Sequence, residues 1–122
     1  MKNTIFTGAG VAIVTPMNED GSVNYDAYAD LIDFQIENKV DAIITCGTTG
    51  ESSTLGEEEH CSVIKFAIDH TAGRVPVIAG TGSNDTKFAI ELSREAAAMG
   101  ADGLLLVTPY YRVGGCYSLL GT

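Results

Sequence analysis

Four short apolar segments alternate with three segments of helical period, and this alternation constrains the fold more than any other feature. The apolar segments are residues 10–15, 41–47, 75–80 and 103–108. Between them, apolar residues recur at helical spacing, as in the inner stripe of the second helical segment, formed by Val63, Ile64, Ala67 and Ile68. Strands joined through helices by short connections require right-handed crossovers and a parallel sheet. The sequence therefore predicts an α/β fold.

The predicted helices carry start and stop signals. Asn24 is the expected N-cap of the first helix, and Thr54 has capping-box spacing at the start of the second. Ser83 or Asn84 should cap the third helix, which should close at Gly100. The inner faces of the first and third helices should carry Tyr28, Leu31, Ile32, Ala89, Leu92, Ala96 and Met99.

The second apolar segment leads into a glycine turn with two hydroxyl groups, residues 47–51 (Gly-Thr-Thr-Gly-Glu). Glycine lets the backbone approach a ligand closely, and Thr48 and Thr49 would present hydroxyl and N–H groups to it. Cys46 is interpreted as core packing, and Glu51 as a structural acceptor of backbone N–H bonds. The carboxyl end of a parallel strand is where α/β proteins place their sites, so this turn is the candidate site.

Composition and charge exclude several classes of function. A net charge of -9 argues against binding a nucleic acid or an anionic membrane. The apolar run at the start of the chain is too short for a signal peptide, and no apolar segment is long enough to span a membrane. A cytoplasmic protein is therefore expected. The three cysteines and two histidines lack metal-ligand spacing, so no metal site is expected.

Phosphate binding has little support in the sequence. Residues 15–18 do not form a glycine-rich loop after the first strand. Residues 80–84 contain two glycines and no lysine, and are interpreted as a tight turn between strand and helix. Four strand–helix units fit either a small open sheet or half of an eight-stranded barrel.

Four segments together resemble the N-terminal part of the dihydrodipicolinate synthase family, which belongs to the pyruvate-dependent class I aldolases. They are residues 8–16, 47–51, 75–82 and 107–111, in the same order and spacing. The resemblance implies that residues 1–112 form the N-terminal half of a TIM (β/α)8 barrel, with about four parallel strands and three helices. It also implies pyruvate as substrate, aspartate 4-semialdehyde as its partner in lysine biosynthesis, and neither a metal nor an organic cofactor.

The resemblance also implies roles for individual residues. Thr48 and Tyr111 would belong to a hydroxyl relay that moves protons, with Tyr111 reaching into a neighbouring subunit. Gly47 and Thr49 would bind the pyruvate carboxylate. In lysine-inhibited relatives, the regulatory site would include the positions of Ser52, Glu57, His60, Asn84, Phe88 and Tyr110. An apolar ring at position 88 replaces an acidic residue there, so lysine inhibition is not expected. His60 itself, following three glutamates, is interpreted as a solvated surface residue.

The resemblance ends near residue 112, and residues 113–122 are interpreted as an unrelated tail of the kind that a truncation or frameshift leaves. In the family, a later strand carries the Schiff-base lysine, and the lysines at positions 2, 39, 65 and 87 lie elsewhere. The chain alone is therefore expected to be inactive. Its exposed edges predict a homo-oligomer, with Ile13, Ile43, Val77 and Leu105 on an inner face that lacks its opposite wall.

Two other interpretations stay open. The chain could belong to a related pyruvate aldolase that acts on sugar acids or neuraminate. Alternatively, it could be a noncatalytic module that associates with itself or with a longer relative.

Overall fold

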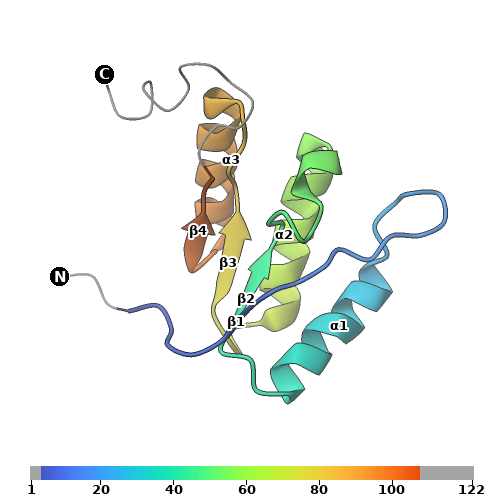
Figure 1. Ribbon diagram of the computed structural model, residues 1–122, viewed down its shortest axis with the longest axis vertical. Coiled ribbons are helices and arrows are strands. Elements are labelled where there is room, and N and C mark those ends of the chain that lie inside the picture. The colour runs from blue at the N-terminus through green and yellow to red at the C-terminus, as the bar shows by residue number, and fades with distance from the viewer. Residues whose placement is uncertain (1–3, 108–122) are drawn as a thin grey trace.

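The computed structural model describes residues 4–107 as a four-stranded parallel sheet with three helices (Figure 1). The strands lie in the order β1-β2-β3-β4, and each crossover contains one α-helix. The predicted α/β fold is therefore confirmed. The elements are β1 (Gly10–Ala12), α1 (Tyr25–Glu37), β2 (Ala42–Thr45), the short 3-10 helix η1 (Ser52–Thr54), α2 (Glu57–Thr71), β3 (Val77–Gly80), α3 (Thr86–Met99) and β4 (Gly103–Leu105).

The hydrophobic core lies between the sheet and its helices. Tyr28 of α1, Ile64 of α2 and Leu92 of α3 are at most 2% exposed and pack in one cluster with Ile43 of β2. The inner stripes predicted for the three helices contribute to this cluster. The helices therefore cover one face of the sheet, and the other face is largely open.

Four residues were predicted to lie on the open inner face of the half barrel, and the prediction was wrong for three of them. Ile13, Ile43 and Val77 are 2%, 0% and 3% exposed and belong to the core beneath the helices. Only Leu105, which is 43% exposed, lies on the open face, in register with Gly80. Strands buried on both faces are apolar throughout, so alternation in the sequence does not show which side chains face the helices.

The signals at the ends of α1 and α3 were partly correct. Asn24 caps α1 by accepting a hydrogen bond in the first turn, and Gly100 closes α3 with a φ of 102°. Ser83 and Asn84 do not cap α3, because Asp85 occupies the N-cap position and accepts from two backbone N–H groups. The Ser83 hydroxyl instead accepts a bond from the Asp85 N–H at 3.1 Å, which orients the cap.

The capping box predicted for α2 is absent. The N-cap is Gly56, which has no side chain to accept a hydrogen bond. Thr54 lies in η1, where its hydroxyl donates to the Glu51 carbonyl at 2.8 Å. Three glutamates in the first turn of α2 interact favourably with the helix dipole and take over the stabilising role of a cap.

Two buried threonines differ in whether the hydroxyl has a hydrogen-bond partner, so they test how such a partner affects stability. The Thr45 hydroxyl bonds to the Tyr28 hydroxyl at 2.5 Å, whereas the Thr71 hydroxyl is buried without a partner in the described part of the chain. Thr71→Val is therefore expected to raise the free energy of unfolding by about 1 kcal/mol, since it removes an unpaired polar group. Thr45→Val should lower it by about 1 to 3 kcal/mol, because Tyr28 loses its partner. Urea unfolding measures both, and equal effects of the same sign would contradict this assignment.

None of the helices within residues 4–107 combines the length and the apolar character that crossing a bilayer requires.

Candidate functional site

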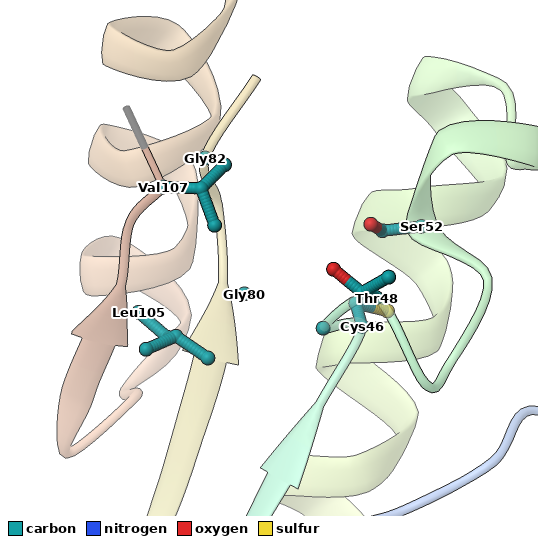
Figure 2. A pocket seen from close by; sticks show the side chains of 8 residues that line it. Cys46, Thr48, Ser52, Gly80, Gly82, Leu105 and Val107 are labelled. Carbon is teal, nitrogen blue, oxygen red and sulfur yellow. The ribbon is translucent and has the colours of Figure 1, made fainter. Parts of the chain in front are cut away.

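A pocket of about 330 Å³ opens at the carboxyl ends of β2, β3 and β4 (Figure 2). The turn after β2 forms one wall, and the ends of β3 and β4 form the other. In parallel α/β folds, this end of the sheet is where ligands bind. The lining residues are Cys46, Gly47, Thr48, Ser52, Gly80, Gly82, Leu105 and Val107.

The turn that follows β2 is fixed by hydrogen bonds. The Gly50 N–H donates to the Gly47 carbonyl at 3.0 Å, and the Thr15 hydroxyl donates to the Gly50 carbonyl at 2.8 Å. Cys46 and Glu51 flank the turn with φ values of 57° and 59°, in the left-handed region that is uncommon for residues other than glycine. Strained backbone of this kind is concentrated at functional sites.

Thr48 and Thr49 lie side by side in the turn, as predicted. Both residues are exposed, and the Thr48 side chain lines the pocket, whereas Thr49 is not among the lining residues. Neither backbone N–H donates to an acceptor within residues 4–107, so both are available to a ligand. Two N–H groups and two hydroxyls in one turn can bind an anion such as a carboxylate. The acceptor role predicted for Glu51 is not observed: among residues 4–107 its exposed carboxylate accepts no hydrogen bond.

Close backbone contact at Gly80 holds the two walls of the pocket together. A β-carbon at this position would lie 2.3 Å from the Cys46 carbonyl oxygen and 2.8 Å from the Gly47 nitrogen. Gly82 is similarly restricted, because a β-carbon there would lie 2.4 Å from the Val107 nitrogen. Both glycines are thus required by space. Residues 81–85 connect β3 to α3, so the predicted turn at 80–84 includes the last residue of β3.

His60 was predicted to be a solvated surface residue, and this prediction was wrong. It is 2% exposed, and its Nε2–H donates to the Gly80 carbonyl at 2.8 Å. The Cys46 thiol donates weakly to the His60 carbonyl at 4.0 Å, so His60 connects α2 to both the turn after β2 and the end of β3 beneath the pocket. Burial lowers the pKa of His60 and favours its neutral form.

The sequence did contain a signal for the burial of His60. Its position is three and four residues before Val63 and Ile64, which places it on the buried stripe of α2. The three glutamates that precede it concealed this spacing.

Cys46 is 1% exposed, which confirms its interpretation as core packing. Burial raises the pKa of its thiol to about 12, so the thiol stays protonated at neutral pH and is a poor nucleophile. No group of three or more potential metal ligands gathers anywhere in residues 4–107.

The positions associated with lysine regulation do not all gather around one cavity. Ser52 lines the pocket and is half-buried, Asn84 is exposed, and Phe88 packs partly buried against the core. His60 is enclosed by the fold, as described above. Tyr110 and Tyr111 lie outside the described residues, as does the predicted tail at 113–122, and their roles stay predictions.

A family model and individual relatives match this chain, and all of them indicate the same family. The model of the dihydrodipicolinate synthetase family matches residues 5–116. The 4-hydroxy-tetrahydrodipicolinate synthase of Lachnoclostridium phytofermentans is 67% identical over 107 residues, which are 88% of this chain and 36% of the relative. The synthase of Acetivibrio thermocellus is 60% identical, over 91% of this chain and 38% of the relative.

Solved structures agree with these relatives. Dihydrodipicolinate synthase from Aquifex aeolicus matches with a TM-score of 0.84 and 54% identity, covering 87% of this chain and 36% of that one. The enzyme from Acinetobacter baumannii, complexed with pyruvate, matches with a TM-score of 0.85 and 52% identity, covering 88% and 37%. The chain therefore spans little more than a third of its relatives, matches their N-terminal part, and has the fold of that part of a TIM barrel. It belongs to the dihydrodipicolinate synthetase family.

Proposed function

We propose that this chain contributes the carboxylate-binding and proton-relay wall of a 4-hydroxy-tetrahydrodipicolinate synthase. In that reaction, pyruvate forms an iminium with a lysine, loses a methyl proton to give an enamine, and attacks aspartate 4-semialdehyde. The observation that carries the proposal is the turn at Thr48 and Thr49, whose free N–H groups and hydroxyls stand at the carboxyl ends of the strands. Pyruvate, named with the Acinetobacter baumannii structure, supplies a carboxylate of suitable size.

The geometry supports separate roles for the two threonines. The Thr48 hydroxyl lines the pocket, where it can pass a proton to and from a bound intermediate. Thr49 offers a hydroxyl and a backbone N–H to the carboxylate, and Gly47 lets the ligand approach the turn. Tyr111 would extend the relay from the segment after β4.

Within residues 4–107, no lysine lies in the position that the reaction requires. Lys39 follows α1, Lys65 pairs with Asp69 on the exposed side of α2 at 3.2 Å, and Lys87 lies in the first turn of α3. These three lysines are exposed and none lines the pocket. A hydrated amine outside the pocket does not form a pyruvate iminium that the threonines could process. We therefore propose that the chain alone has no synthase activity.

Borohydride trapping tests this proposal directly. The purified 122-residue chain is incubated with pyruvate and sodium borohydride and then weighed by intact-mass spectrometry. The expected mass is that of the unmodified 12.8 kDa chain, whereas a full-length synthase treated in parallel should gain one reduced pyruvate adduct. A stoichiometric adduct on any lysine of this chain would contradict the proposal.

We also propose that, without another partner, two copies associate through their open sheet edges. Val14, on the β1 side, is 50% exposed, and Leu105 on β4 is 43% exposed. Exposed apolar surface beside unpaired strands favours association. Sedimentation showing a folded monomer at micromolar concentration would contradict it. The cytoplasmic location expected from the sequence stays a prediction.

A further inference from the structure

The β4 edge of the sheet carries an unpaired strand with exposed apolar side chains on both of its faces. β4 is the last strand in the sheet order, so its outer N–H and C=O groups face no other strand within residues 4–107. Four consecutive apolar residues run along this edge, and each is between 38% and 56% exposed: Leu104, Leu105, Leu106 and Val107. Proteins rarely leave such an edge in water, so this surface is suited to binding another polypeptide.

A groove of about 430 Å³ lies beside this edge, between α3 and the residues after β4. Ala89 and Ile90 form one apolar side of it, and Leu106 and Val107 form the other. Ile90 is 48% exposed, an unusual state for a large apolar side chain on a helix flanking a groove. The apolar residues that line the groove suit contact with the apolar stripe of a helix.

A positive charge in the groove indicates which kind of helix could bind there. Arg94 lies in the groove, and no carboxylate of residues 4–107 forms an ion pair with it. The chain has a net charge of -9, so this cation offers a local attraction that the overall surface does not. A helix with an acidic residue next to its apolar stripe would pair with Arg94.

The occupant follows from the fold of the relatives. The chain matches the Aquifex aeolicus synthase with a TM-score of 0.84 but covers 36% of that protein. In a (β/α)8 barrel, each strand is followed by an outer helix, and the next strand pairs with its edge. The part of a family chain that follows β4 therefore supplies both a helix for the groove and a strand for the β4 edge.

We propose that the β4 edge and its groove bind this complementary segment of a family chain when it is supplied as a separate polypeptide. Binding completes the barrel around the pocket at Thr48 and brings the reactive lysine of the segment to it. The binding itself depends on the surface described here, whereas the return of chemistry rests on the proposed function.

The test uses the full 122-residue chain and the segment of the Lachnoclostridium phytofermentans synthase that lies beyond its 107 matched residues. The two polypeptides are co-expressed, and in parallel refolded together, and the complex is measured by sedimentation. We expect a 1:1 complex that replaces any homo-oligomer. Ile90→Asp should weaken the association about tenfold or more, because it places a charge in the apolar groove.

Ala98→Asp is the matched control, since it adds the same charge to an exposed position of α3 that does not line the groove. Its affinity should stay within about twofold of the unmodified chain. The proposal is overturned if no 1:1 complex forms by either route, if homo-oligomers persist in the mixture, or if Ile90→Asp binds as well as Ala98→Asp.

Pyruvate and borohydride then separate the two proposals. In the complex, the lysine amine attacks the keto carbon, water leaves, and borohydride reduces the C=N bond to a stable secondary amine. An adduct on the segment that requires this chain supports both proposals. A 1:1 complex without an adduct supports the docking surface and contradicts the proposed function.

Discussion

Gly80→Ala is expected to lower the free energy of unfolding by about 3 kcal/mol or more, because the added methyl group has no space. It would lie 2.3 Å from the Cys46 carbonyl oxygen and 2.6 Å from the carbonyl carbon. These atoms belong to the backbone, so they cannot avoid the clash by changing a rotamer. Relief requires β2 and β3 to separate at the end that forms the pocket, so the same substitution should also disturb the Thr48 turn.

Gly56→Ala is the control for this prediction. No atom lies within 4 Å of a β-carbon at position 56, and the φ of -67° suits any residue. Alanine is a poorer N-cap than glycine but lowers the entropy of the unfolded chain, so the effect on urea unfolding should remain within about 1 kcal/mol. Similar losses in the two variants would show that close contact between the strands at Gly80 is not what restricts this position.

The order of strands and helices could be predicted because it depends on local pattern. Asn24 and Gly100 were identified correctly, since a side-chain cap and a left-handed closing residue are encoded within one turn of the helix. The start of α2 was not, because the Thr54 hydroxyl bonds to the Glu51 carbonyl in η1 instead of capping the helix. Backbone geometry, which the sequence does not show, decides whether such a hydroxyl donates to a nearby carbonyl or accepts from the first turn of a helix.

In the candidate site, too, some features follow from local sequence and others from contacts between distant residues. The turn at Thr48 and Thr49 could be located from its glycines and from the strand before it. The close approach at Gly80 and the bond from His60 join residues 20 or more positions apart, so they follow from the packing of β2 and α2 against β3. The orientation of Ile43 toward the helices likewise depends on how the whole sheet is covered.

His60→Ala is expected to lower the free energy of unfolding by about 3 kcal/mol at pH 7.5. The substitution leaves a cavity where a 2% exposed ring stood and removes the hydrogen bond to the Gly80 carbonyl. His60→Gln is the informative comparison, because its amide nitrogen can donate to the same carbonyl without titrating. His60→Leu is its match, because it fills a similar space without a donor. If His60 acted mainly by filling space, the Gln and Leu variants would lose equal stability, whereas we expect a clearly smaller loss for Gln.

The pH dependence of stability gives a second measure of the same residue. Burial lowers the pKa of His60 in the folded chain below its ordinary value of 6.5, so at acidic pH the unfolded chain binds more protons. Stability conferred by neutral His60 is thus complete above about pH 7.5 and is lost as pH falls through 6.5, by at most about 1.4 kcal/mol per pH unit. Other groups titrate in both proteins, so the informative quantity is the stability of the unmodified chain minus that of His60→Gln. Urea unfolding between about pH 5 and 8 should show this difference shrinking toward acid, and a difference independent of pH would mean that the His60 ring accepts a proton as readily when folded as when unfolded.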